Sequence, residues 1–176
     1  MRRAERRGSC RLTGSERIES NRLLLDPLTL EQSSAFSRSD RVAQPWATDF
    51  PTDGDLRQAN ILANHPERAV SPTNVWGPYT LIDKRTGLCI GGIGFKRLPD
   101  STGTVEIGYG ICASCQGQGL MTEAVDRLCE LARAEGALAV TAETDVANIA
   151  SQRVLDKCCF TRLSTEFESI WWRLDL

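Results

Sequence analysis

The sequence predicts a mixed α/β protein whose strands and helices follow the order β-α-α-β-β-β-α-β-α-β-β. Two observations carry this prediction. Short apolar runs bounded by turn-forming residues fill the middle of the chain and its C-terminal end, which is typical of strands. Between them lie stretches whose apolar residues recur every three or four positions, which is the spacing of one helix face.

The predicted strands are the short apolar runs. They cover residues 23–25, 79–83, 88–95, 105–112, 138–144, 160–163 and 167–174. Lys84-Arg85-Thr86-Gly87 has the composition of a hairpin turn, and residues 98–103 form a second turn. The strands in the middle of the chain are therefore expected to pair as an antiparallel meander.

Four helices are predicted, over about residues 29–41, 55–63, 120–136 and 148–157. Thr52 or Asp53 is expected to cap the second helix, and Asn148 the fourth. Inner positions are expected at Leu30, Ser33, Ser34 and Phe36 in the first helix, at Leu56, Ile61 and Leu62 in the second, and at Met121, Ala124, Val125, Leu128 and Ala132 in the third.

Length and composition indicate one soluble globular domain. The chain has 176 residues, 41% hydrophobic and 25% charged, and no apolar run approaches the roughly 20 residues that span a bilayer. Seven cysteines, an odd number without repeated spacing, favour reduced thiols in a cytoplasmic protein. Cys112 and Cys115 have a metal-like spacing but lack a second pair of ligands, so we expect no metal.

The charge is distributed unevenly. Residues 1–17 carry six arginines against Glu5 and Glu16, whereas the whole chain has a net charge of −2. We expect residues 1–17 to be a basic, disordered extension and residues 18–176 to be the folded domain. A basic arm that touches RNA or an acidic surface is the alternative, although we do not expect a nucleic-acid partner.

A segment with two glycines joins the strand that ends at Cys112 to the third helix. Gln116-Gly117-Gln118-Gly119 can aim several backbone N–H groups at one point beside a helix N-terminus, which suits a phosphate. An ordinary tight connection is the alternative. The segment lacks the lysine of a Walker loop, and Thr122 stands where a dinucleotide fingerprint needs a third glycine.

The segment Gln116-Gly117-Gln118-Gly119-Leu120-Met121-Thr122-Glu123-Ala124 resembles the acyl-CoA-binding turn of the GNAT N-acetyltransferases, in the branch of the ribosomal-protein N-terminal (alanine/serine) acetyltransferases. Residues 148–160 and 21–29 are similar to two further blocks of that branch, in the same order. The resemblance covers roughly residues 18 to 174. It implies an α+β fold with a mostly antiparallel sheet of six to seven strands, about four flanking helices, and two central strands that splay apart after the turn.

The resemblance also implies acetyl-CoA as co-substrate and a role for named residues. Backbone amides of Gln116, Gly117, Gln118, Gly119, Leu120, Met121 and Thr122 would hold its pyrophosphate. Main-chain groups of Ile111 and Cys112 would meet the pantetheine arm. Asn148 would bind the same arm or serve only as a helix cap, and Ser151 lies where the thiolate would emerge.

For catalysis the resemblance implies Glu106 as the general base; a solvated strand carboxylate is the alternative reading. Leu155 stands where many relatives place a tyrosine that acts as general acid. The thiolate would then be protonated by Ser151, by water or by no group at all. Cys159 replaces the usual glycine before Phe160. An acyl-cysteine route through Cys112 or Cys115 is a less economical mechanism than direct attack by the amine.

The acceptor is expected to be a primary amine, on a protein N-terminus or a small molecule. Trp46, Phe50 and Trp76 would line its pocket or simply cover the sheet. A divergent acyl-CoA-binding module without catalysis is the alternative function, because Leu155 and Cys159 depart from the family pattern. We expect no membrane partner, and a monomer or homodimer.

Overall fold

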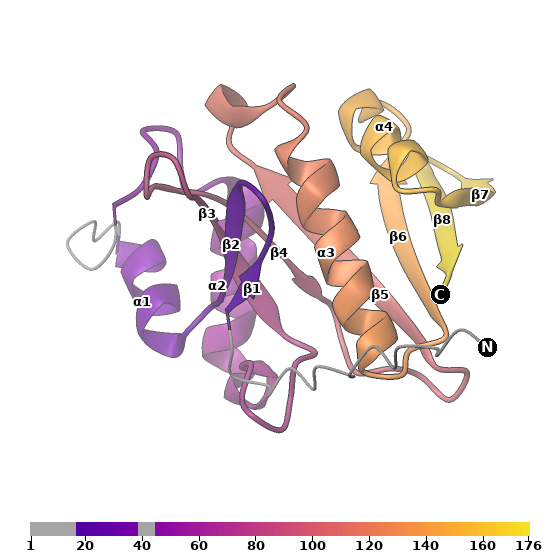
Figure 1. Ribbon diagram of the computed structural model, residues 1–176, viewed down its shortest axis with the longest axis horizontal. Helices are drawn as coiled ribbons and strands as arrows, with labels where there is room; N and C mark the ends of the chain where they lie inside the picture. Colours follow the sequence, from indigo (N-terminus) through magenta and orange to yellow (C-terminus); the bar gives the residue numbers. More distant parts are fainter. Residues whose placement is uncertain (1–16, 39–44) are drawn as a thin grey trace, which may run out of the picture.

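The computed structural model describes residues 17–38 and 45–176 and is built around one eight-stranded sheet (Figure 1). The strands are β1 (Ile18–Glu19), β2 (Leu23–Pro27), β3 (Pro78–Asp83), β4 (Cys89–Phe95), β5 (Thr104–Ile111), β6 (Ala139–Asp145), β7 (Thr161–Glu166) and β8 (Ser169–Asp175). The helices are α1 (Leu30–Arg38), α2 (Asp53–Asn64), α3 (Leu120–Ala134) and α4 (Ile149–Lys157), with short 3₁₀ turns η1 (Pro66–Arg68) and η2 (Ala113–Cys115).

The strand order is β1-β2-β3-β4-β5-β6-β8-β7, and only β5 and β6 run parallel. The prediction of a mixed, mostly antiparallel sheet with four helices is confirmed. The strand count is eight rather than six to seven because β1 adds a two-residue edge strand, with Ile18 opposite Leu25. Two residues are too few to show an alternating pattern, so the sequence gives no sign of β1.

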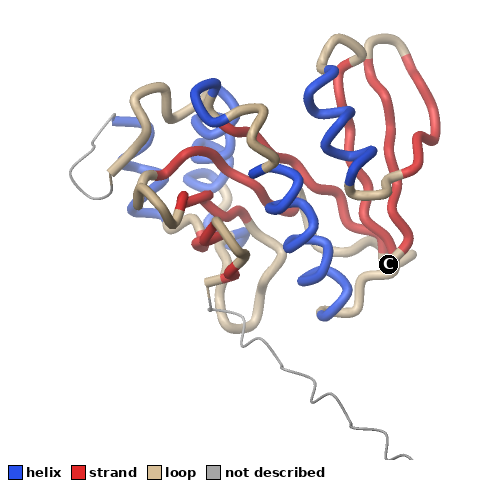
Figure 2. The backbone as a smooth tube through the Cα atoms, turned by 45° about the horizontal axis from the view of Figure 1, so that its top comes forward, coloured by secondary structure: helices blue, strands red, loops and turns tan. Residues whose placement is uncertain are grey.

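The two central strands separate halfway along their length. β5 pairs with β6 only from Thr104 to Ile107, opposite Ala139 to Ala142. Beyond that point residues 108–111 pair with β4 alone, and residues 143–145 pair with β8 alone. Figure 2 shows the two halves of the sheet diverging from the end near the C-terminus. The second half of β5 therefore has an edge that no strand of residues 17–38 and 45–176 covers.

Helices cover both faces of the sheet. α3 lies in front of the strands in Figure 1 and packs against β2, β4, β5 and β6, whereas α2 lies behind and packs against β4, β5 and α1. The apolar stripe of α3 is buried as its spacing predicts: Leu120, Met121, Ala124, Val125, Leu128, Cys129, Leu131 and Ala132. This burial fixes the N-terminus of α3 beside the gap between β5 and β6.

Element ends differ from the prediction by a few residues. α1 is described to Arg38, and its predicted last residues, 39–41, lie outside the described residues. Leu30 is 44% exposed instead of facing inward, and Ala35 occupies an inner position in its place. α2 begins two residues early because Thr52 and Asp55 form a reciprocal capping box.

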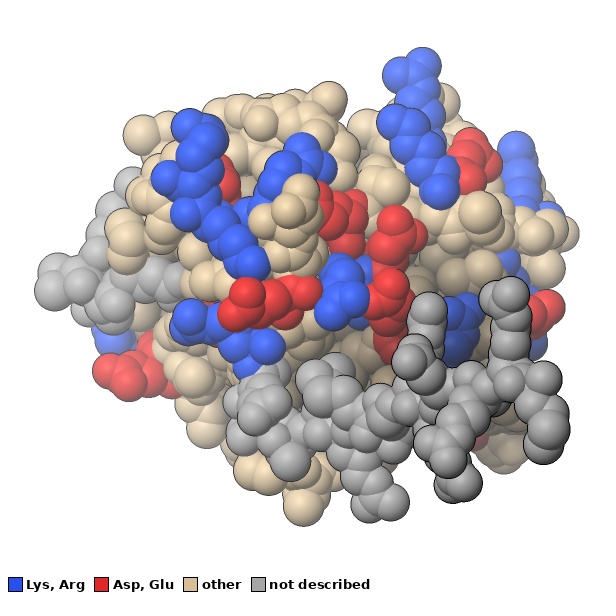
Figure 3. Space-filling view, in the orientation of Figure 1, with Lys and Arg blue, Asp and Glu red and all other residues tan. Residues whose placement is uncertain are grey.

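The first sixteen residues of the predicted extension also lie outside the described residues. Arg17 is described and forms an ion pair with Asp26. Figure 3 shows the face that carries β1, β2 and α3, where lysine and arginine side chains lie beside aspartate and glutamate. Charges of both signs are mixed on this face.

Candidate active site

A cavity of about 400 Å³ occupies the gap between the diverging strands. It is lined by β5, by residues of the segment 116–119 (the glycine turn), by the start of α3 and by α4. Nine residues predicted for the site are brought together there: Ile111, Gln116, Gly117, Gly119, Leu120, Met121, Thr122, Asn148 and Ser151. Cys112 and Gln118 are not in its lining; the Cys112 amide donates to the Ile90 carbonyl at 2.9 Å.

The glycine turn presents backbone donors to this cavity. Gly117 and Gly119 have φ values of 73° and 74°, a region that favours glycine. The N–H groups of Gly117, Gln118 and Gly119 donate to no acceptor within the described part of the chain. The first N–H groups of α3 also lack helical partners, and the helix has no side-chain cap. These amides and the helix dipole form a site for an anion.

Two contacts from distant segments hold the turn in place. Arg22 donates through Nη1 to the Gln118 carbonyl at 2.9 Å and through Nε to Glu123 at 2.7 Å. Asp49 accepts hydrogen bonds from the amide and the hydroxyl of Ser114, at 2.9 and 2.7 Å. Hydrogen bonds from the Ser114 amide and hydroxyl lower the pKa of Asp49 below its ordinary value, so it stays ionised in this role.

Cations on α4 line the other side of the cavity. Arg153 and Lys157 line it together with Asn148 and Ser151. Neither cation has a carboxylate within ion-pairing distance among residues 17–38 and 45–176. The cavity thus offers backbone donors on one wall and positive side chains on the other, which suits a ligand with several negative charges.

Asn148 acts as the helix cap that the sequence predicts. Its side chain accepts a hydrogen bond from the Ser151 amide at 3.0 Å, while the residue also lines the cavity. The cap orients Ser151, whose hydroxyl faces β5.

Tyr109 on β5 is a site residue that sequence reasoning missed. Its hydroxyl lies 2.7 Å from Ser151 Oγ and 3.3 Å from the Ser151 carbonyl oxygen. Burial raises the pKa of Tyr109 to about 12, so the hydroxyl stays protonated at neutral pH. Tyr109 follows Val105 and Ile107 at alternate positions of the strand, and this spacing alone is that of a core residue. Leu155, which stands where many relatives have a general-acid tyrosine, is fully buried.

Glu106 lies on the opposite face of β5 from Tyr109. Its carboxylate forms an ion pair of 2.5 Å with Lys96 Nζ, and 18% of its side chain is exposed. Glu106 lines neither this cavity nor a second cavity behind the sheet, whereas Lys96 lines the second.

The second cavity, of about 470 Å³, lies between α1 and α2 and the rear face of β4 and β5. Its floor is bare backbone, because Gly92 pairs with Gly110 and Gly94 with Gly108. Tyr109 and Gly110 line both cavities. The two cavities therefore share a wall at the second half of β5.

The three predicted acceptor-site aromatics lie beside this region. Trp46 and Phe50 are buried and pack edge-on against each other and against Phe36, with ring centroids 5.2 to 5.7 Å apart. Trp76 packs on Phe95 at 4.9 Å. None of the three lines either cavity within the described residues.

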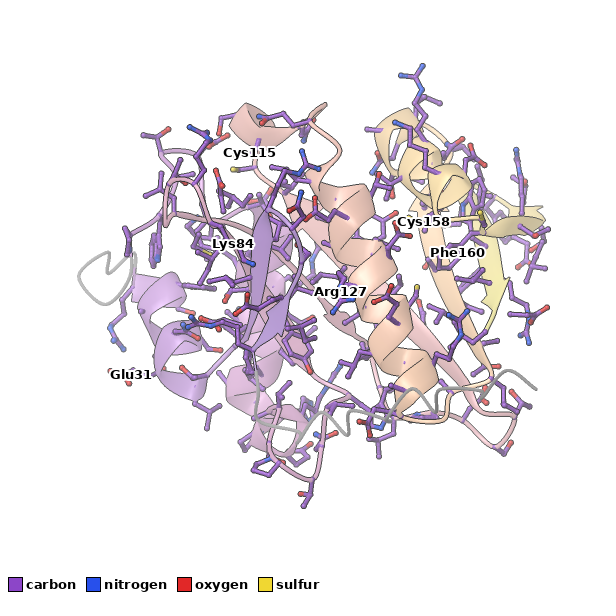
Figure 4. All side chains as sticks on the ribbon, viewed as in Figure 1. Glu31, Lys84, Cys115, Arg127, Cys158 and Phe160 are labelled. Carbon is purple, nitrogen blue, oxygen red and sulfur yellow. The ribbon has the colours of Figure 1, made fainter. Side chains whose placement is uncertain are left out.

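Cys112 has the properties of an inert thiol. Burial raises the pKa of Cys112 to about 12, which leaves almost no thiolate at neutral pH for an acyl-cysteine route. Figure 4 shows Cys115 in the segment before α3 and Cys158 at the end of α4. In the part of the chain that the structure describes, no three His, Cys, Asp or Glu side chains are grouped to hold a metal ion.

The chain is similar to known acetyltransferases in sequence and in fold. The family model of the acetyltransferase (GNAT) domain matches residues 22–161. The uncharacterized N-acetyltransferase YjdG of Bacillus subtilis (strain 168) is 27% identical over 149 residues, which cover 81% of this chain and 88% of YjdG.

Two solved structures show the shared fold. The ribosomal-protein-S5-alanine acetyltransferase of Vibrio fischeri is 16% identical with a TM-score of 0.61, covering 91% of this chain and 96% of that one. The microcin C7 self-immunity acetyltransferase MccE, solved with acetyl-CoA and AMP, is 16% identical with a TM-score of 0.63, covering 89% and 94%. Among the helices of the described residues, none is long and apolar enough to cross a membrane.

Proposed function

Because this chain belongs to the GNAT family of acetyltransferases, we propose that it transfers an acetyl group from acetyl-CoA to a primary amine by direct attack in a ternary complex. One observation carries the proposal. Gly117 and Gly119, whose amides donate to no acceptor among the described residues, line a cavity that opens where β5 and β6 diverge.

The residues of this cavity fit acetyl-CoA. Amides between Gln116 and Thr122 would hold its pyrophosphate, with Arg153 and Lys157 as counter-charges. The open edge of β5, including Ile111, would pair with the pantetheine arm, and Asn148 would bind the same arm. Acetyl-CoA supplies an activated thioester whose sulfur is a good leaving group.

The reaction needs two proton transfers. The amine nitrogen forms a bond to the acetyl carbon, the carbon–sulfur bond breaks, one proton leaves the nitrogen, and one proton reaches the sulfur. We assign the first transfer to Glu106 as general base. A water molecule would carry the proton from the amine to this carboxylate, which also forms an ion pair with Lys96. We assign the second to the Tyr109 hydroxyl, acting directly or through Ser151 Oγ. Tyr109 would then donate the proton that a tyrosine at position 155 donates in many relatives, because this chain has leucine there.

A non-catalytic acyl-CoA-binding module is the second candidate. The position of Glu106 favours it, because this carboxylate lines neither cavity and is held in an ion pair by Lys96. A protein N-terminus is one possible acceptor, by similarity to the ribosomal-protein-S5-alanine acetyltransferase. We expect the protein to act in the cytoplasm, as a monomer or homodimer.

Calorimetric titration with acetyl-CoA, CoA and ATP tests the donor site first. Micromolar binding of acetyl-CoA and CoA but not ATP is expected; a folded protein that binds neither would refute the proposal. Release of CoA thiol in the presence of an amine panel then separates the enzyme from the binding module.

A further inference from the structure

The second cavity has charged residues of both signs in its lining. A single buried carboxylate, Asp55, lies over the glycine floor near the junction with the first cavity. Arg57, Arg68, Lys96 and Arg97 line the same cavity. A cavity of about 470 Å³ is of the size that holds a small ligand.

Asp55 is placed to receive a positive group. It is 7% exposed, and its Oδ2 accepts from the Thr52 amide at 2.9 Å and the Thr52 hydroxyl at 2.6 Å. Its Oδ1 accepts no hydrogen bond from any described residue and lies 2.6 Å from where a Cβ on Gly92 would stand. No cation pairs with it in the described part of the chain. One carboxylate oxygen is therefore left for a ligand.

The position of Asp55 matches the reacting end of an acceptor. Gly92 pairs directly with Gly110, which lines both cavities. Burial raises the pKa of Asp55 above its ordinary value, so an ammonium group that binds beside it recovers lost solvation. An amine bound at Asp55 would therefore lie one strand away from Gly110, which forms part of the wall of the first cavity.

The arginines are placed to receive a negative group. Arg57, Arg68 and Arg97 have no carboxylate within ion-pairing distance among the described residues. Arg68 donates one hydrogen bond to the Lys96 carbonyl, which fixes its guanidinium at the end of β4. Gln58, one turn after Asp55 on α2, adds a buried Nε2 that donates to no acceptor in the described residues. Unpaired guanidinium and amide donors favour the binding of an anionic ligand group.

From these contacts we infer that the acceptor is a small amine that also carries a carboxylate or phosphate, with its amine at Asp55 and its anion at Arg57, Arg68 and Arg97. This inference rests on the proposed function and names its substrate class. Gly92 on β4 and Lys96, which directly follows β4, are four residues apart, a span of about 13 Å in extended chain. The long arginine side chains reach back over part of this span, so several bonds separate amine and anion in the acceptor.

Three amines of equal length test the inference: 6-aminohexanoate, hexylamine and 1,6-diaminohexane. We expect kcat/KM for 6-aminohexanoate to exceed that for hexylamine by about tenfold or more, with the diamine lowest, and the preference to shrink as salt rises. 6-Aminohexyl phosphate in place of 6-aminohexanoate distinguishes a phosphate from a carboxylate as the preferred anion.

Variants assign the preference to its residues. Arg57→Gln combined with Arg97→Gln is expected to remove the preference, so that kcat/KM for 6-aminohexanoate falls to about that for hexylamine in the same variant. Asp55→Asn is expected to weaken both amines, with acetyl-CoA affinity and Tm as measures of an intact fold. Arg162→Gln, an exposed arginine on β7, is the matched control.

Binding of 6-aminohexanoate to the CoA-saturated protein by calorimetry separates the two proposals. Binding without turnover supports the acceptor class and refutes catalysis. Turnover of all three amines at equal rates, unaffected by the arginine variants, overturns the inference and leaves the acetyltransferase reaction standing. Tenfold faster acetylation of a neutral tripeptide amide than of 6-aminohexanoate overturns it as well.

Discussion

Arg22 and Glu123 join two segments 101 residues apart through a pair of hydrogen bonds, each of 2.7 Å. The Arg22 amide and Nε donate to the two carboxylate oxygens, while Nη1 reaches the Gln118 carbonyl. The start of β2 is therefore tied to both the glycine turn and the first turn of α3. Although burial raises the pKa of Glu123, hydrogen bonds from Ser20 and Arg22 lower it overall.

We expect Arg22→Ala to weaken acetyl-CoA binding by about fivefold, because the turn loses the contact that holds its amides in position. The unfolding free energy is expected to fall by no more than about 1 kcal/mol, since the Arg22 side chain is 46% exposed. Calorimetric titration and denaturant unfolding measure the two effects. Arg162→Ala serves as control, and unchanged affinity in Arg22→Ala would show that the turn is rigid without this contact.

The turn glycines allow a second prediction with a matched control. Gly117 and Gly87 have φ values of 73° and 70°, and a Cβ on either would meet no atom within 4 Å. Gly117→Ala and Gly87→Ala should therefore each lower the unfolding free energy by about 1–2 kcal/mol, the cost of a left-handed backbone. Only Gly117→Ala is expected to weaken acetyl-CoA binding. Equal loss of affinity in both variants would mean that general destabilisation is the cause.

Much of the fold was predictable because local patterns and burial agree. The apolar stripe of α3, the cap at Asn148 and the hairpin at residues 84–87 depend on neighbours close in the chain. Leu30 was misplaced because helical spacing alone does not distinguish the edge of a short apolar stripe from its centre.

The site was predictable only where one segment forms it. The glycine turn carries its donors within a few residues, so the sequence indicates them. The contact between Tyr109 and Ser151 spans 42 residues and depends on the divergence of β5 and β6, which no local spacing encodes. Asp55 faces Gly92 for the same kind of reason: α2 and β4 meet only in the folded protein.

Cys159 holds a backbone conformation that favours glycine. Its φ is 63°, and its side chain is exposed after the end of α4. Cys159→Gly is expected to raise the unfolding free energy by roughly 0.5–1 kcal/mol, since relief of the left-handed strain exceeds the added entropy of the unfolded chain. Turnover should not change. Thermal unfolding measures the effect, and a lower Tm would contradict the expected relief.

Glu106→Gln tests the general base. We expect kcat to fall about 100-fold or more with acetyl-CoA affinity unchanged, because glutamine keeps the shape but accepts no proton. Glu130→Gln, an exposed ion-pair variant on α3, is the control. Wild-type turnover in Glu106→Gln would remove Glu106 from the mechanism.

Tyr109→Phe tests the proton donor against the other tyrosine of the chain. Tyr79 is buried, and its hydroxyl donates to the Val75 carbonyl at 3.0 Å. Tyr109 is half-buried, and its hydroxyl contacts Ser151. Each Tyr→Phe variant loses the hydrogen bonding of one hydroxyl and is expected to lose about 1 kcal/mol of stability. Only Tyr109→Phe is expected to lower kcat, by about tenfold to 100-fold, with the acetyl-CoA dissociation constant unchanged.

The pH dependence of stability gives an independent check on Tyr109. Its pKa is about 12 in the folded protein and about 10 in the unfolded chain, so folding favours the protonated form. The stability that this difference supplies is complete below about pH 10 and is lost as pH rises toward about 12. The wild type should therefore lose stability relative to Tyr109→Phe over that window. Parallel stability curves would show that Tyr109 titrates normally, and its hydroxyl would then ionise too early to remain a proton donor at high pH.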